Sequence, residues 1–332
     1  MNFLPTFIGS DYVYLVIGFI VLIKGADILV SGASSIASKL GISPLVIGLT
    51  IVAFGTSAPE LFVNILSAMR GQTELALGNV IGSNIANTLL VLGVAAMIYP
   101  LQAKSSTIYK EVPFTLIASL ALFFLAFDVF FSGETINILT RGESLIFLLF
   151  FVLFFAYTFG LAKQTKEIPE ELDGIQSQSM KKSLLYVFLG LVGLSLGADL
   201  LVNSARSIAL SFNVSETVIG LTVVALGTSA PELVTSIVAS MKKQSDIAIG
   251  NVVGSNIFNI LLVLGLTGGI ANLPVSDNLI TDIIVEILSI VLLIIVLMFI
   301  GKKGLITRIE GTLFFGLYLT YMGYLIFTQV LL

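Results

Sequence analysis

Two glutamates lie inside long apolar stretches of this chain, and each ends a copy of the same motif. Residues 50–60 read TIVAFGTSAPE and residues 222–232 read TVVALGTSAPE, so Glu60 and Glu232 stand 172 positions apart. A charged side chain is costly inside a membrane and is usually functional there. The duplication therefore predicts a cation site at the interface of two repeats.

Each copy of the motif also offers neutral oxygen atoms as ligands. Four hydroxyl side chains precede the glutamates: Thr56, Ser57, Thr228 and Ser229. Pro59 and Pro231 each remove a backbone donor and clash with the carbonyl four residues earlier, that of Gly55 or Gly227. A carbonyl freed at membrane depth needs another partner, and a bound cation can be that partner.

A second duplicated motif lies in the apolar stretch that follows each copy of the first. Residues 78–87 read GNVIGSNIAN and residues 250–259 read GNVVGSNIFN, again 172 positions apart. Its candidate ligands are Ser83, Asn87, Ser255 and Asn259. Ser83 and Asn87 are four residues apart and share one helix face. The glycines at 78, 82, 250 and 254 allow helices to approach closely.

All these candidate ligands are oxygen atoms, and the chain contains no cysteine or histidine. Oxygen ligands suit hard cations such as Ca²⁺, Mg²⁺ or Na⁺ rather than zinc or copper. Two carboxylates neutralise one divalent ion or about two monovalent ions, and competition between these occupancies is a physical basis for exchange. Either motif alone more often reflects a tolerated helix kink or close helix packing. Two motifs that are both duplicated at the same offset favour a cation site instead.

The composition predicts an all-α membrane protein. Of 332 residues, 57% are hydrophobic and 11% are charged, which no soluble globular domain matches. A hydrocarbon core of about 30 Å needs roughly 20 apolar residues per helix, and on that measure we expect ten transmembrane helices. The expected spans are 12–38, 43–69, 73–99, 111–130, 142–162, 183–210, 215–240, 246–271, 280–300 and 309–330.

Lysine and arginine predict the orientation in the cell membrane. The basic residues of the odd-numbered loops are Lys39, Lys104, Lys110, Lys163, Lys166, Lys181, Lys182, Lys242, Lys243, Lys302, Lys303 and Arg308. The opposite side carries Arg70 and Arg141, with Arg206 near a span end. The excess puts the odd loops in the cytoplasm and both termini outside the cell.

The offset of 172 residues divides the chain into two halves. Residues 1–162 form the first expected five-helix repeat and residues 183–332 the second, joined by a cytoplasmic linker at 163–182. The paired motifs fall at about 43–99 and 215–271. Because five spans is an odd number, the second half enters the membrane from the other side, which gives inverted repeats.

Four further charged residues in the spans have structural interpretations. Asp27 and its counterpart Asp199 are expected to cap or pair rather than to bind ions, and Lys24, one turn from Asp27, to form a local salt bridge with it. Glu286 has no acidic counterpart, and we expect an interhelical polar contact there.

At these motifs the chain resembles the cation/calcium exchanger superfamily, and most of all its prokaryotic sodium/calcium exchangers. The GTSAPE segments with GNVIGSNIAN and GNVVGSNIFN look like the two alpha-repeats of that family. The resemblance covers essentially the whole chain. It implies an electrogenic antiporter, not an enzyme, that exchanges three Na⁺ for one Ca²⁺ by alternating access and needs no cofactor. It also implies that the first and sixth spans slide across the core.

The resemblance further implies a role for each motif position. Glu60 and Glu232 would be the main Ca²⁺ ligands, helped by Thr56 and Thr228. Ligands for Na⁺ would be these glutamates together with Ser57, Ser83, Ser229, Ser255 and the backbone carbonyls near Ala53 and Ala225. Asn87 and Asn259 would occupy the central position. Some relatives, including potassium-dependent ones, carry an aspartate where Asn259 stands, so the amide argues against K⁺ co-transport.

Other functions remain open from the residues alone. Proton/calcium exchange is the nearest alternative, although proton/calcium exchangers differ at the first motif. A channel would need an open filter, usually on an oligomer axis, whereas here one chain carries both acids and a monomer suffices. An intramembrane aspartyl protease could use Asp27 and Asp199, but the hydroxyls and amides surround the glutamates. The net charge of −4 is too small to indicate a charged partner such as a nucleic acid.

Overall fold

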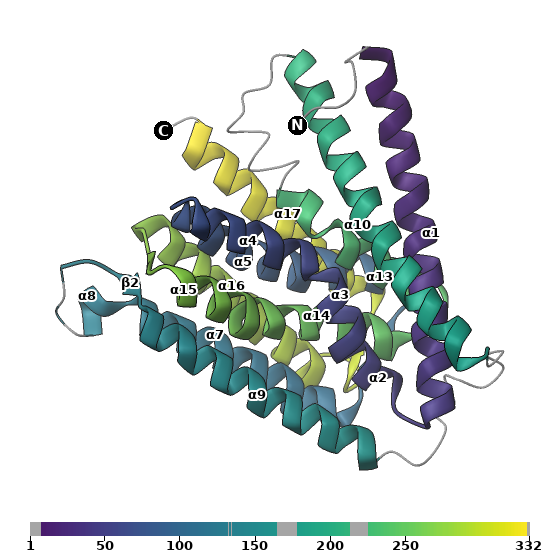
Figure 1. Cartoon of the computed structure of the whole chain (residues 1–332). Helices are drawn as coiled ribbons and strands as arrows, with labels where there is room; N and C mark the ends of the chain where they lie inside the picture. Colours follow the sequence, from purple (N-terminus) through teal and green to yellow (C-terminus); the bar gives the residue numbers. More distant parts are fainter. Residues whose placement is uncertain (1–7, 132, 134, 165–177, 213–224, 331–332) are drawn as a thin grey trace.

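The computed structural model describes residues 8–131, 133, 135–164, 178–212 and 225–330, and these are mainly helical (Figure 1). In the first half the helices are α1 (Ile8–Leu40), α2 (Pro44–Ile47), α3 (Ala53–Thr56), α4 (Ala58–Met69), α5 (Thr73–Ile85), α6 (Leu92–Ile98), α7 (Val112–Ala126), α8 (Asp128–Phe131) and α9 (Arg141–Gln164). In the second half they are α10 (Met180–Ser211), α12 (Ala225–Thr228), α13 (Ala230–Met241), α14 (Ser245–Ile257), α15 (Gly265–Ile270), α16 (Asp277–Phe299) and α17 (Arg308–Val330). The π-helical segments are η1 (Gly48–Val52), η2 (Ala86–Val91), η3 (Thr107–Glu111) and η6 (Phe258–Leu264).

Within the described residues, eight helical stretches are long and apolar enough to cross a membrane. A ninth span arises if Pro44–Thr56 and Ala58–Met69, which meet at a bend of 44°, are taken together. Part of the expected span 215–240 falls outside the described residues, and its described part consists of α12 and α13. The chain is therefore a multi-pass helical membrane protein, while the count of ten stays a prediction.

The second span is broken where the sequence places proline. Helix α3 ends at Thr56, Ser57 has φ −84° and ψ 3°, and α4 begins at Ala58. Pro59 thus takes a position in the first turn of a new helix, where its missing N–H costs nothing. Ser229, with φ −84° and ψ 4°, separates α12 from α13 in the same way. The expected span 43–69 therefore corresponds to two helical pieces, because proline here begins a new helix after the break.

The fourth span also differs from its expected bounds of 111–130. It starts earlier, with η3 at Thr107, and α7 ends at Ala126. Phe127 leaves the helical region with φ −110° and ψ 48°. The Asp128 side chain then accepts a hydrogen bond from the Ile138 N–H at 3.0 Å, which ties the following loop to the end of the span.

The two spans that carry the second motif form the centre of the bundle. The span Ser245–Ile270 has 94% of its most apolar window buried and Leu75–Ile98 has 78%, against 17% for Arg141–Ala162 in α9. Each central span changes from α-helix to π-helix at the end of its GSN segment, at Ala86 or Phe258. Such π-helical insertions often occur at functional sites.

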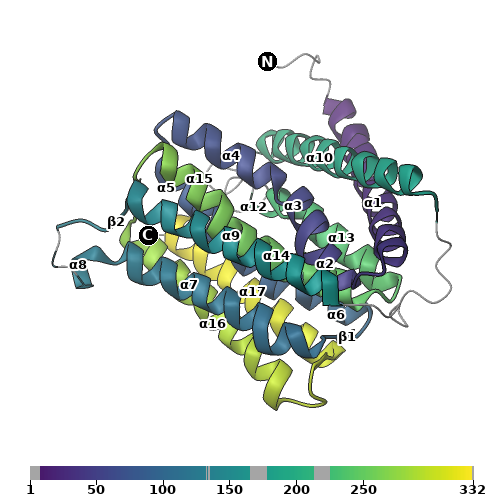
Figure 2. The same ribbon diagram turned by 60° about the horizontal axis from the view of Figure 1, so that its bottom comes forward.

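Helices α1 and α10 run side by side along one flank of the molecule, while α7 and α9 lie on the opposite flank (Figures 1 and 2). Glycines let the backbones of α1 and α10 touch. A Cβ added at Gly25 would lie 2.8 Å from the Leu194 nitrogen, and one added at Gly197 would lie 2.7 Å from the Leu22 nitrogen. The two helices therefore pack as one unit.

Short antiparallel ladders join the two halves of the chain at the ends of the bundle. Strand β1 (Leu101–Gln102) pairs with β4 (Leu305–Ile306), with Leu101 opposite Ile306. Strand β2 (Ile138–Leu139) pairs with β3 (Leu273–Pro274), with Leu139 opposite Leu273. These ladders satisfy backbone groups in loops that would otherwise leave them unpaired.

The close contact between α1 and α10 predicts a sensitivity of Gly25 to the smallest side chain. We expect Gly25→Ala to lower the thermal stability of the detergent-solubilised protein, because overpacking costs about 1–3 kcal/mol. Gly160→Ala is the matched control in α9, since a Cβ there meets no described atom within 4 Å. Equal unfolding temperatures for the two variants would contradict the packing argument.

Candidate functional site

The two motif glutamates are fully buried, each in the first turn of the helix that follows a break. Glu60 is the third residue of α4 and Glu232 the third residue of α13, and both have 0% of their surface exposed. A helix N-terminus favours a negative charge in its first turn. Two unneutralised charges would be costly in such a place, so the arrangement favours a bound cation.

Glu232 receives hydroxyl groups from both halves of the chain. Ser57 donates to its Oε1 at 3.1 Å and Ser255 at 3.4 Å. Ser255 also lies 3.4 Å from the Thr56 hydroxyl. Predicted ligands from both motifs thus meet at this carboxylate, although Glu232 is 175 residues from Ser57.

Several oxygen atoms of the site have no hydrogen-bond partner among the described residues. They are both carboxylate oxygens of Glu60, Oε2 of Glu232, the hydroxyls of Ser83 and Ser229, and the amide oxygens of Asn87 and Asn259. Buried polar atoms without partners are rare in native proteins. Seven of the buried oxygen atoms without a partner in the described part of the chain therefore belong to predicted ligands.

The motif threonines are held by asparagines of the opposite half. Thr56 donates to Asn251 Oδ1 at 3.0 Å, and Thr228 donates to Asn79 Oδ1 at 3.4 Å. Asn251 donates in turn to Ser236 at 3.0 Å. The first asparagine of each GNV segment therefore orients a threonine. Sequence reasoning missed this role, although the duplication of GNV was a signal for it.

A second reciprocal pair of amides joins the central spans. Asn87 donates through Nδ2 to Asn256 Oδ1 at 3.0 Å, and Asn259 donates to Asn84 Oδ1 at 3.1 Å. Each hydrogen bond links one half of the chain to the other. The donors Asn87 and Asn259 are 172 residues apart, and so are the acceptors Asn84 and Asn256. Because the amide nitrogens are engaged, the oxygens of Asn87 and Asn259 remain available. Asn84 and Asn256 were not predicted as supporting residues.

The interhelical contact expected for Glu286 is confirmed. Its Oε1 accepts hydrogen bonds from Asn84 at 2.8 Å and from Ser119 at 3.0 Å, across α5, α7 and α16. Glu286 thereby fixes Asn84, which accepts from Asn259.

The local salt bridge expected between Lys24 and Asp27 was wrong. Asp27 instead pairs at 2.7 Å with Lys242, the residue directly after α13, because the tertiary fold brings this distant lysine to it. Asp199 accepts a hydrogen bond from Asn203 of its own helix at 2.9 Å. Both aspartates therefore have structural partners, as the sequence indicated.

Two backbone carbonyls and four glycines complete the predicted set. The Ala53 carbonyl accepts from the Ser57 N–H at 3.0 Å and from the Thr56 hydroxyl at 3.3 Å, and Ala225 is the first residue of α12. Among the glycines, Gly250 and Gly254 receive another backbone: their added Cβ atoms would lie 2.9 Å from Leu45 O and 2.9 Å from Leu49 Cα. At Gly78 the only close neighbour, Leu279, is at an ordinary 3.5 Å.

Few of the candidate cation ligands are charged. Within the described part of the chain, no group of three or more acidic, histidine or cysteine side chains could hold a metal ion. The site combines two carboxylates with hydroxyl and amide oxygens. Such a set suits a hard cation that must also leave.

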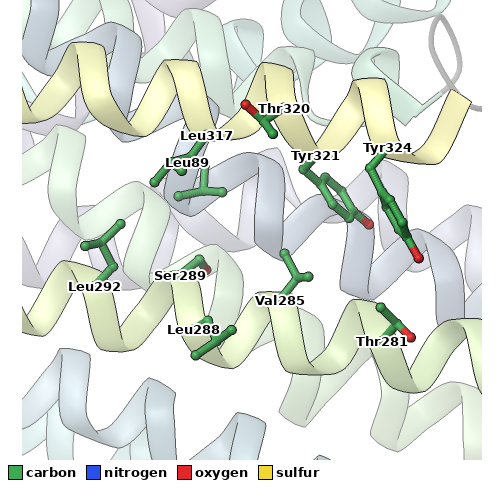
Figure 3. Close-up of a pocket in the computed structure, with 10 residues that line it drawn as sticks. All are labelled: Leu89, Thr281, Val285, Leu288, Ser289, Leu292, Leu317, Thr320, Tyr321 and Tyr324. Atoms are coloured by element: carbon green, nitrogen blue, oxygen red, sulfur yellow. The ribbon is translucent and has the colours of Figure 1, made fainter. Parts of the chain in front are cut away.

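A separate cavity of about 490 Å³ lies between α16 and α17 (Figure 3). Leu89, Leu292 and Leu317 are among its lining residues, and no carboxylate lines it. Tyr321 contributes its ring to the wall and donates its hydroxyl to Asp282 at 2.9 Å. This cavity lacks the charged ligands that a cation site needs.

Comparison with known proteins identifies the family. The sequence profile of the sodium/calcium exchanger protein family matches residues 10–160 and 182–327, and the chain belongs to this family. It is 38% identical to the putative antiporter CaxA of Alkalimonas amylolytica, over 96% of this chain and 98% of that protein. It is 31% identical to the sodium/calcium exchanger MaX1 of Methanosarcina acetivorans, over 94% of this chain and 97% of that protein.

A solved structure supports the same assignment. The fold matches that of the sodium-calcium exchanger NCX_Mj with a TM-score of 0.81 and 31% identity, over 96% of this chain and 99% of that one. The protein is accordingly a multi-pass membrane cation/Ca²⁺ exchanger and not an enzyme.

The contact of Glu286 with two donors predicts a structural cost for its removal. We expect Glu286→Ala to destabilise the solubilised protein by about 1–3 kcal/mol, because Asn84 and Ser119 lose a buried acceptor. Glu286→Gln keeps an oxygen acceptor and serves as the matched control. Thermal unfolding in detergent measures both, and an alanine variant as stable as the glutamine variant would contradict the argument.

Proposed function

We propose that the protein exchanges Na⁺ for Ca²⁺ across the cell membrane by alternating access. The proposed site is built on Glu60 and Glu232. The observation that carries the proposal is that both motif glutamates are fully buried, while oxygen atoms of predicted ligands in both halves have no hydrogen-bond partner among the described residues. The sodium/calcium exchangers among its relatives support Na⁺ as the counter-ion.

The proposed ligands follow from the same geometry and from the sequence motifs. Glu60 and Glu232 would carry the charge that Ca²⁺ requires. The neutral oxygens would come from the remaining candidate residues: Ala53, Thr56, Ser57, Ser83, Asn87, Ala225, Thr228, Ser229, Ser255 and Asn259. Two negative charges match one Ca²⁺, whereas several Na⁺ ions can share the carboxylates and the surrounding hydroxyls. Mutual exclusion of the two occupancies would couple the fluxes, at three Na⁺ per Ca²⁺ by analogy with the family.

We also propose an architecture of ten transmembrane helices in two inverted five-helix repeats, residues 1–162 and 183–332. The reciprocal hydrogen bonds between the halves support it. So do the strand ladders, since β1 starts 172 residues before β3 and the two take partners from opposite halves. The excess of basic residues in the odd loops supports extracellular termini and a cytoplasmic linker at 163–182. Both motif copies lie on one chain, so a monomer would suffice.

The counter-ion is tested by the gradient that drives uptake. Proteoliposomes loaded with Na⁺ and diluted into Na⁺-free medium should accumulate ⁴⁵Ca²⁺. The uptake should cease when choline replaces internal Na⁺. A proton gradient of equal size is the control. Uptake with protons but not with Na⁺ would overturn the proposal in favour of proton/calcium exchange.

The site is tested by removing each carboxylate. Glu60→Ala and Glu232→Ala should reduce Ca²⁺ uptake to the level of protein-free vesicles, because half of the charge that neutralises Ca²⁺ is lost. Glu143→Gln is the control, since that glutamate only accepts hydrogen bonds from Thr140 at the start of α9. Transport by a Glu232→Ala protein that matches wild type would refute the assignment.

A further inference from the structure

The C-terminal half of helix α1 is attached to the core by a charged contact. Lys242, directly after α13, places its Nζ 2.7 Å from Asp27 Oδ1, and it also donates to the Asp27 carbonyl at 2.9 Å and to the Ser31 hydroxyl at 2.8 Å. Farther along α1, Ser34 donates to the side chain of the buried Gln244. Thus α1 contacts the turn between α13 and α14 through three of its side chains.

The sequence repeats the parts of this contact in the other half. At the offset of 172 residues, Asp199 corresponds to Asp27, Arg70 to Lys242 and Gln72 to Gln244. The charges of the pair are therefore conserved between the two halves of one chain, with an arginine in place of the lysine. Neither half of the candidate ion site includes these residues.

The repeated contact is not made in this structure. Arg70 is exposed and forms no ion pair with any described residue, and Gln72 is exposed as well. Asp199 accepts instead from Asn203 of its own helix at 2.9 Å. The two halves thus have matching residues in opposite states, one ion pair formed and its counterpart open.

The helices that precede Lys242 and Arg70, α13 and α4, also differ in how far a neighbouring helix covers them. Helix α1 packs against α13, whereas α10 and α4 touch at most marginally. Val238 of α13 is 8% exposed, and its counterpart Leu66 of α4 is 48% exposed. The open ion pair therefore accompanies an uncovered helix face, and the closed ion pair a covered one.

The glycine contacts between α1 and α10 couple the contact of α1 with α13 to the position of α10 relative to α4. Because these helices pack backbone to backbone at Gly25 and Gly197, a shift of one along the core carries the other with it. A movement that covers α4 with α10 would withdraw α1 from α13. In a protein with duplicated halves, interchanging the states of the halves yields the second conformation.

We propose that Asp27 and Asp199 are positioning residues of the transport cycle that act alternately. Asp27 holds the α1–α10 pair over α13 through Lys242, and Asp199 holds it over α4 through Arg70 in the opposite state. This proposal rests on the alternating access proposed above. It assigns the balance between the two access states to two ion pairs that bind no transported ion.

The balance between the two access states is measured by the distance between spin labels on α4 and α10. The chain has no cysteine, so Met69→Cys with Leu210→Cys gives a spin-labelled pair with no competing site. Both positions are exposed and outside the proposed ion pairs. Double electron–electron resonance on the full-length protein in lipid nanodiscs should report a longer distance for the state described here and a shorter one when α10 covers α4.

Removing one ion pair should shift the two populations in a defined direction. Asp27→Asn or Lys242→Gln should raise the ratio of short to long distances by roughly two- to fivefold, as befits a partly exposed ion pair. Asp199→Asn or Arg70→Gln should lower it. Lys243→Gln and Lys24→Gln are matched controls without an effect on the ratio. An Asp27→Asn distribution equal to that of wild type would overturn the proposal.

Exchanging the charges of Asp27 and Lys242 distinguishes loss of the ion pair from misfolding of the variant. Asp27→Lys should shift the distances and slow Ca²⁺ flux, and Asp27→Lys with Lys242→Asp should restore both. Failure of the double variant to restore the distance distribution would count against the ion pair. The distances need no flux, so a wild-type protein without Na⁺-driven Ca²⁺ uptake would refute the proposed function while leaving the distance test intact.

Discussion

The burial of two carboxylates in the centre of a membrane protein is the constraint on which the remaining structure depends. Glu60 and Glu232 are fully buried, each in the first turn of a helix that follows a break. The protein compensates only in part: Glu232 receives two hydroxyls, while the oxygens of Glu60 have no partner among the described residues. A pair of buried carboxylates with few hydrogen bonds favours the binding of a cation. A site made only of charged ligands would bind the cation too tightly for its release.

Holding such a site open requires rigid surroundings. The amides of Asn84, Asn87, Asn256 and Asn259 are hydrogen-bonded across the two halves, which leaves two amide oxygens facing no other donor. Glu286 anchors one end of this network. Because each amide is fixed through its nitrogen, the oxygens keep their positions when no ion compensates them. The broken helices act in the same way, since restarting at Ala58 and Ala230 directs a helix N-terminus at each carboxylate.

The molecule is divided into a rigid centre and a flanking helix pair with weaker attachments. The central spans are the most deeply buried, whereas α1 and α10 contact each other closely and the core more sparsely. The only ion pairs between described residues, Lys104 with Asp246 and Lys242 with Asp27, lie away from the carboxylate site. A partly exposed ion pair contributes little to stability. It can nevertheless decide between two arrangements that differ little in free energy.

The sequence by itself determined the class of protein, most span positions and the identity of the ligand candidates, because the cost of a charge in apolar sequence can be read locally and the duplication marks it twice. It did not predict that a new helix begins at Ala58, the supporting role of Asn79 and Asn251, or the partner of Asp27. These depend on residues that are up to 215 positions apart, such as Lys242 and Asp27. Only the tertiary structure decided them, since the choice between Lys24 and Lys242 follows from how α1 crosses α13, and that crossing is set by packing of the whole bundle.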